Sequence, residues 1–261
     1  MDVTEPARLA LAIRRDLDLS DLGAALQAGW LDFRSAPAFG LFFGAVFVVA
    51  GLVLSYLLFA RGEVVWLIPA AAGFPLLAPF TAVGLYEVSR RREMGLPLNW
   101  LAILGAVRGR GDEQILSMGV LLFVAFGFWI IVAHAIFSIF LVEAGAGSES
   151  LAFLLTPTGV AMLVVGGIVG ALIAFVFYIA TVISLPMLVH RKVDFLTAIF
   201  SSIQAVVRNF RVLLVWAALI AAALCLAMLP MFLGLLIVLP VLGHATWHLY
   251  RRTVPSAFSE P

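Results

Sequence analysis

The sequence predicts an all-α membrane protein, a polytopic helix bundle in which six transmembrane helices form three hairpins and a short amphipathic helix precedes each hairpin. Apolar residues make up 64% of the 261 residues and charged residues only 12%, whereas a soluble domain has roughly 45–50% and 25%. The apolar residues gather in blocks long enough to cross ~30 Å of hydrocarbon. All 16 Lys and Arg residues except Arg61 fall on one side of a single threading of these blocks through a membrane.

Six hydrophobic segments are predicted to cross the bilayer. An even number places both termini on the side that holds the Lys and Arg residues, and the positive-inside rule assigns that side to the cytoplasm. Treating the chain from Val212 onward as one long helix would give five spans and place Arg251 and Arg252 outside, which the same rule disfavours. The predicted spans are 38–60, 64–88, 115–142, 159–189, 212–229 and 231–250.

A short amphipathic helix is predicted before each pair of spans. The three helices begin at Ser20-Asp21, Asn99 and Asp194, which are residue types that cap helix N-termini. Their apolar faces are expected to lie in the inner headgroup layer of the membrane. The residues of these faces are Leu22, Ala25, Leu26, Gly29, Trp30 and Phe33 in the first helix, Trp100, Ile103, Leu104 and Val107 in the second, and Phe195, Ala198, Ile199, Ile203 and Val206 in the third.

These units suggest a triple repeat within one transmembrane domain, predicted over 20–252. The predicted repeats are 20–90, 98–190 and 193–252. The alternative is that any cytoplasmic connection of this length looks amphipathic. Residues 1–19 and 253–261 are predicted to be cytoplasmic segments. The first of these has acidic residues among its Arg residues and no uninterrupted apolar run, so it is not expected to be a signal peptide.

Segments spread along the chain carry a recognisable pattern. They are Gly29-Trp-Leu-Asp-Phe-Arg-Ser-Ala-Pro37, Gly40-Leu-Phe-Phe-Gly44, Gly84-Leu-Tyr-Glu-Val-Ser-Arg90, Ile183-Ser-Leu-Pro-Met187 and Leu239-Pro-Val-Leu-Gly-His-Ala-Thr-Trp-His-Leu-Tyr-Arg-Arg252. Together they resemble a family of uncharacterised bacterial integral membrane proteins, a domain-of-unknown-function family in which some members are labelled cytochrome c oxidase subunit I-like. The resemblance covers residues 29–252. It implies a bacterial inner-membrane protein of about six helices, with no established activity and no verified catalytic residue.

The oxidase label implies histidine ligands for haem or copper. The chain has four histidines: His134, His190, His244 and His248. The last two are four residues apart and share a helix face, whereas His134 is expected roughly 9 Å from them in depth. A redox subunit that uses His134, His244 and His248 is therefore the third functional hypothesis. The alternatives are a buried His134 bonded to a neighbouring helix, and an aromatic and polar belt at the inner interface that the C-terminal pair shares with Trp247 and Tyr250.

The second span is predicted to be interrupted. Pro69, Gly73, Pro75 and Pro79 lie within it, and proline removes a backbone donor and clashes with the preceding turn. Because discontinuous helices line the sites of membrane carriers, a channel or transporter for a small neutral or lipidic solute is the second hypothesis. The alternative is a kinked packing helix or a partly re-entrant segment. A proton-coupled carrier is disfavoured, since no carboxylate is expected near the bilayer midplane.

Small residues at two places have the spacing that lets helices approach closely, Gly40 with Gly44 and Gly166 with Gly170. We expect them to serve packing within the chain rather than dimerisation.

Enzyme signatures do not occur in the sequence, which has no phosphate-binding loop, nucleophile elbow or zinc-protease helix. No catalytic residue, metal or cofactor is therefore expected. The basic clusters need no nucleic acid to explain them, because membrane topology already does. The leading hypothesis is a non-enzymatic accessory or scaffold subunit. Its expected partners are membrane lipids and either another membrane protein complex or further copies of the chain.

Overall fold

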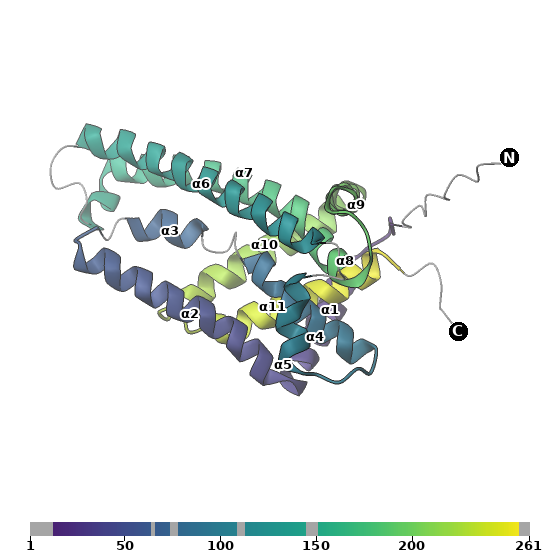
Figure 1. The fold of residues 1–261 in the computed structure, drawn as a ribbon. Helices are drawn as coiled ribbons and strands as arrows, with labels where there is room; N and C mark the ends of the chain where they lie inside the picture. The colour runs from purple at the N-terminus through teal and green to yellow at the C-terminus, as the bar shows by residue number, and fades with distance from the viewer. Residues whose placement is uncertain (1–12, 64–65, 74–77, 109–112, 145–150, 256–261) are drawn as a thin grey trace.

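The computed structural model confirms the all-α prediction (Figure 1). It describes residues 13–63, 66–73, 78–108, 113–144 and 151–255, and these contain no strand. The α-helices are α1 Leu19–Ser35, α2 Pro37–Ala60, α3 Leu67–Gly73, α4 Ala78–Glu93, α5 Trp100–Gly105, α6 Gln114–Ala144, α7 Pro157–Thr181, α8 Ser184–His190, α9 Phe195–Arg208, α10 Phe210–Met228 and α11 Leu235–Thr253. Two 3-10 helices, Ala106–Arg108 and Leu151–Leu155, follow α5 and precede α7.

Four helical segments among the described residues are long and apolar enough to cross a membrane. They are Pro37–Ala60, Gln114–Leu141, Pro157–His190 and Phe210–Met228. They coincide with the first, third, fourth and fifth predicted spans, and their ends differ by a few residues at most. The third of them comprises α7 and α8, which are separated only by a short turn.

The second and sixth predicted spans are not among these four, so the six-span arrangement is not confirmed. The second is divided between the seven-residue α3 and the separate α4, whose last turns carry Glu87 and Arg90–Arg92. The sixth corresponds to α11, which begins four residues later than predicted and carries Pro240. Polar side chains in the second half of α11 lower its hydropathy, and most of its residues are buried against other helices.

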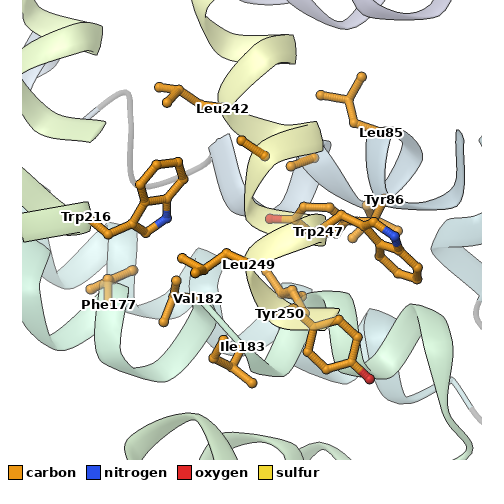
Figure 2. Packing of buried hydrophobic residues seen from close by; sticks show 14 of the residues in the cluster. Leu85, Tyr86, Phe177, Val182, Ile183, Trp216, Leu242, Trp247, Leu249 and Tyr250 are labelled. Atoms are coloured by element: carbon orange, nitrogen blue, oxygen red, sulfur yellow. The ribbon is translucent and has the colours of Figure 1, made fainter. Parts of the chain in front are cut away.

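The core of the protein surrounds α11, which contacts α1, α2, α4, α8 and α10. Figure 2 shows Trp247, Leu249 and Tyr250 of α11 packed among side chains of the neighbouring helices. Trp247 and Tyr250 are completely buried. The predicted aromatic belt at the membrane interface is therefore wrong for these two residues, because they fill the centre of the protein.

Glycines let α1 and α2 approach the α11 backbone. A Cβ atom added at Gly29 would lie 2.5 Å from the Ala245 nitrogen, and one at Gly44 would lie 2.9 Å from the Cα atom of Leu236. Both distances are shorter than van der Waals contact, so only glycine fits at this separation of the helix axes. Gly40 is equally close to α11, at 3.0 Å from the Cβ atom of Pro240. The expected packing role of Gly40 and Gly44 within the chain is confirmed.

The three short helices begin close to the predicted positions. Asn99 and Asp194 cap α5 and α9 by accepting a hydrogen bond from the backbone N–H three residues later. The first helix instead starts after Asp18, whose carboxylate accepts from the backbone of Asp21 while the Asp21 side chain accepts from the backbone of Asp18. This reciprocal capping box places the capping residue two positions before Ser20, so α1 begins at Leu19.

The apolar face of α1 packs on protein, contrary to the prediction that it lies in the headgroup layer. Leu22, Ala25 and Phe33 are buried, and α1 lies along α11. Helical periodicity identifies a face that avoids water, but it does not identify what covers that face. In α9, Ala198 and Val206 of the predicted lipid face are likewise buried.

Candidate functional site

A cluster of polar side chains joins α1, α4 and α11 where these helices meet. We call it the polar cluster, and it consists of Asp32, Ser89, Arg92, His244 and His248. Asp32 is its centre. The Ser89 hydroxyl donates to Asp32 Oδ2 at 2.6 Å, and His248 Nε2 lies 2.8 Å from the same oxygen. One guanidinium nitrogen of Arg92 lies 2.5 Å from Asp32 Oδ1.

Helical spacing explains how the sequence brings these groups together. His244 and His248 are one turn apart on α11 and so share a face, as do Ser89 and Arg92 on α4. Asp32 lies near the end of α1, about one turn after Gly29, the glycine at which α1 contacts the α11 backbone. The carboxylate is therefore placed between two pairs of polar side chains from two other helices.

The hydroxyl proton of Ser89 fixes how the hydrogen bonds run. A carboxylate only accepts, so Ser89 must give its single proton to Asp32. Its oxygen lies 2.8 Å from His244 Nδ1 and must accept there, which makes Nδ1 the protonated nitrogen of that ring. His244 Nε2 is buried and has no hydrogen-bond partner among the described residues. A buried polar atom without a hydrogen-bond partner lowers the stability of the folded state by on the order of 1–3 kcal/mol.

The surroundings of Asp32 keep it ionised. Burial on its own raises the pKa of this carboxyl, since the charged form loses hydration. Hydrogen bonds from His248 and Ser89 act in the opposite direction and prevail, so its pKa lies below the ordinary value for aspartate. The adjacent Arg92 guanidinium balances the negative charge.

The order of groups in the polar cluster differs from that of a catalytic triad. In a Ser-His-Asp triad the imidazole lies between the hydroxyl and the carboxylate and takes the hydroxyl proton. Here the Ser89 hydroxyl lies between Asp32 and His244, donates its hydrogen bond to the carboxylate and accepts one from the Nδ1–H of the ring. Ser89 is 1% and His244 0% exposed, so neither meets solvent. Chemically, the cluster is suited to tie three helices together.

Several arginines near the polar cluster form ion pairs with glutamates. Glu87 accepts from both Arg90 and Arg91, each with a nitrogen–oxygen distance of 2.7 Å. Glu93 pairs with Arg251 at 2.8 Å and so links α4 to the end of α11. These cations stabilise helix contacts in addition to any effect on topology.

The three histidines singled out from the sequence have different neighbours. His244 and His248 lie together in the polar cluster, where His244 contacts Ser89 and His248 contacts Asp32. His134 lies in α6 and stacks on the Trp66 ring with centroids 4.9 Å apart. Within the described part of the chain, no group of three or more His, Cys, Asp or Glu side chains is placed to hold a metal ion. A haem or copper centre on these histidines stays a prediction, testable by an optical spectrum and metal analysis.

The proline-rich part of the second span is packed against α6. Pro69 and Gly73 lie in α3, and Pro79 lies in the first turn of α4, whereas Pro75 lies outside the described residues. The buried Trp129 indole donates to the Pro69 carbonyl oxygen at 3.3 Å. A Cβ atom at Gly73 would lie 2.4 Å from that indole nitrogen. A protein side chain therefore binds a backbone carbonyl within this short helix.

Sequence analysis missed the centre of the polar cluster. Asp32 is an acidic residue beside the apolar face of an amphipathic helix, and Ser89 stands between charged residues at the end of a span. The first position carried a usable signal, because an acid next to a face that must be buried needs a partner. Nothing local pointed to Ser89, whose role depends on which helices lie beside it.

The middle of the chain matches a known protein family. Residues 67–190 match the model of a family described as predicted integral membrane protein (DUF2189). This part of the chain is therefore similar to an uncharacterised family of integral membrane proteins. The resemblance inferred from the motifs is confirmed at this level, whereas the oxidase-like label is not part of the match. In the polar cluster, Ser89 and Arg92 fall inside the part that matches DUF2189, and Asp32, His244 and His248 fall outside it. No curated protein and no solved structure matches the chain significantly.

Proposed function

We propose that the protein is a non-enzymatic accessory or scaffold subunit of the bacterial inner membrane. The observation that carries this proposal is that the polar groups at the centre of the fold are engaged with one another. Asp32 receives hydrogen bonds from α4 and α11, and Ser89 and His244 are closed to solvent. A catalytic or transported substrate would have to displace these contacts, whereas a structural subunit uses them to keep its shape.

The membrane-spanning helices support a role in assembly. Between 11% and 28% of the most apolar stretch of each candidate span is buried inside the protein. The least buried is Pro157–His190, where Val164, Ile168 and Leu172 are exposed on α7. Lipids, another membrane protein complex or further copies of this chain can cover such a surface.

The arrangement of the ends supports a cytoplasmic location for both termini. Helix α1 and the last turns of α11 pack together, so the described chain begins and ends on the same side (Figure 1). Most Lys and Arg residues gather there, as expected of a cytoplasmic face. On this view α11 and the α3–α4 pair return through the membrane, giving three hairpins, each preceded by one of the capped helices.

Capture in mild detergent, with a matched pair of variants, tests the assembly role. A tagged chain should retain a reproducible membrane-protein partner or a second copy. Ile168→Trp, on the exposed face of α7, should weaken that association, while the equally exposed Ile131→Trp on α6 serves as the control. A chain that purifies alone, with no partner and no lipid preference, would contradict the proposal.

One observation favours a channel or transporter for a small neutral or lipidic solute as the second candidate. The second hydrophobic segment is divided into α3 and α4, as in carriers whose broken helices line a site. The indole of Trp129 packs against this division, so Trp129→Ala should raise solute flux in proteoliposomes if a path runs there. Flux no higher than in protein-free vesicles, for both wild type and variant, would exclude this candidate.

A further inference from the structure

Helix α9 runs across the direction of α6 and α7. In Figure 1 it is seen nearly end-on, beside α8, while α6 and α7 lie along the plane of the view. It is capped by Asp194, and its first backbone N–H donates to the side chain of Gln114 at 3.0 Å. The orientation of α9 is therefore fixed by contacts at its N-terminus, and it is the orientation of a helix lying parallel to a membrane plane.

The protein-facing side of α9 is made mostly of small and polar residues. Ala198, Ser201, Ser202 and Ala205 are buried, and α9 contacts α7 and α8. The Ser202 hydroxyl donates to the Ile179 carbonyl oxygen at 2.6 Å and accepts from a backbone N–H in the α7–α8 turn. Val206 is buried on the same side, and Phe195 and Ile199 pack partly buried against the core, so apolar contacts as well as hydrogen bonds attach α9 to the bundle.

A second set of large apolar residues of α9 faces outward as one stripe. They recur at helical spacing and are Leu196, Phe200, Ile203 and Val207. Phe200 is 68% exposed. The next large exposed apolar residues along the chain are Phe210 and Leu214 on α10, one of the four candidate membrane spans. A helix with an exposed apolar stripe directly before a membrane span is suited to the interface of the bilayer.

Basic residues flank this stripe. Lys192 precedes α9, Arg208 lies in its last turn and Arg211 begins α10. None of them forms an ion pair with a carboxylate among the described residues, in contrast to Arg90 and Arg91 on α4. The capping carboxylate of Asp194 accepts from the helix backbone.

We propose that α9 binds anionic phospholipid. The stripe enters the boundary between headgroups and acyl chains, and the three cations contact lipid phosphates. The occupant is a lipid rather than a protein because the helix lies crosswise, joins a membrane span and carries unpaired positive charge at both ends. The proposal does not depend on whether the protein serves as a scaffold.

A single-cysteine labelling experiment tests the position of the stripe. Cys225 is the only cysteine, so Phe200→Cys and Asp16→Cys are each made in a Cys225→Ser background of the full chain and given an environment-sensitive fluorophore. Both positions are exposed, but residue 200 lies on the stripe and residue 16 lies before α1, outside α9. In proteoliposomes with brominated lipids, quenching should be several-fold stronger at 200 than at 16. Equal quenching would overturn the proposal, as would quenching at 200 that requires a co-purified protein.

A charge-matched pair of variants tests the lipid headgroup. Arg208→Gln with Arg211→Gln should lower the preference for phosphatidylglycerol over phosphatidylcholine, measured by native mass spectrometry, with about fivefold lost per cation. The control, Arg34→Gln with Arg61→Gln, removes the same charge from exposed positions outside α9 and should keep the preference. An unchanged preference in the α9 variant, or an equal loss in the control, would overturn the proposal.

Discussion

Removing the Asp32 carboxylate should destabilise the whole junction of α1, α4 and α11. Asp32→Ala leaves the Ser89 hydroxyl and His248 without their acceptor and Arg92 without its counter-ion. Loss of one partner from a buried ion pair costs about 3–5 kcal/mol. The Arg92 side chain is 31% exposed and regains water, so we expect a loss of about 2–4 kcal/mol in the free energy of unfolding.

Asp32→Asn separates the charge from the hydrogen bonds. The amide oxygen can still accept from Arg92, and the amide nitrogen can donate to His248 Nε2 in the neutral ring. Hydrogen bonds to a charged group contribute about 1.5–3 kcal/mol and neutral ones about 0.5–1.5. The asparagine variant should therefore lose about 1–2 kcal/mol, less than the alanine variant.

Unfolding in a mild detergent, followed by tryptophan fluorescence, measures these effects. The control is Asp16→Ala, because Asp16 is 78% exposed and its ion pair with Arg14 lies on the surface. Surface pairs contribute about 0–1 kcal/mol, so this variant should behave like the wild type. A double-mutant cycle of Asp32→Ala with Ser89→Ala should give a coupling of about 0.5–3 kcal/mol. A loss below about 0.5 kcal/mol in Asp32→Ala, or no coupling, would refute this account of the junction.

Three further predictions concern acid stability, helix contact and the second hydrophobic segment. The pKa of Asp32 is lower in the folded protein than its ordinary value. Its ionised form therefore stabilises the fold above the unfolded pKa of about 3.9, and this stabilisation is lost as the pH falls through the folded pKa. On acidification the unfolding temperature should drop less steeply in Asp32→Asn than in the wild type. Gly29→Ala places a Cβ atom 2.5 Å from the Ala245 nitrogen and should cost about 1–3 kcal/mol, whereas Gly23→Ala, which meets nothing within 4 Å in the same helix, should be neutral or stabilising by up to about 1 kcal/mol. Trp129→Phe removes the donor to the Pro69 carbonyl oxygen and should cost about 1–2 kcal/mol in thermal unfolding, and an unchanged melting temperature would show that this bond contributes nothing.

Local features of the sequence were sufficient to predict the elements. The four most apolar helices end within a few residues of the predicted bounds, because hydropathy over 20 residues is a property of the segment alone. Asn99 and Asp194 were identified as caps for the same reason, since a cap bonds to the backbone three residues away. The same logic failed by two residues at Ser20, where Asp18 offered a reciprocal partner.

The partners of each helix could not be predicted from local patterns. The polar cluster joins Asp32 to Ser89 at a separation of 57 residues and to His248 at a separation of 216. Helical spacing correctly placed His244 and His248 on one face, but both a metal site and a hydrogen-bonded contact fit that spacing. The carboxylate that His248 contacts comes from α1, a helix more than 200 residues away that the spacing on α11 does not specify.

The polar half of α11 explains why this protein needs the polar cluster at all. Between helices in lipid the hydrophobic effect gives little preference for one neighbour over another, so close backbone contact and polar pairs decide which helices meet. Helix α11 has both devices: Gly29 and Gly44 bring two neighbours against its backbone, and His244 and His248 accept only a neighbour that offers a matching group. A fully apolar α11 would be a better membrane span and a worse centre for the fold. Its low hydropathy is therefore a consequence of specifying three neighbours in one register.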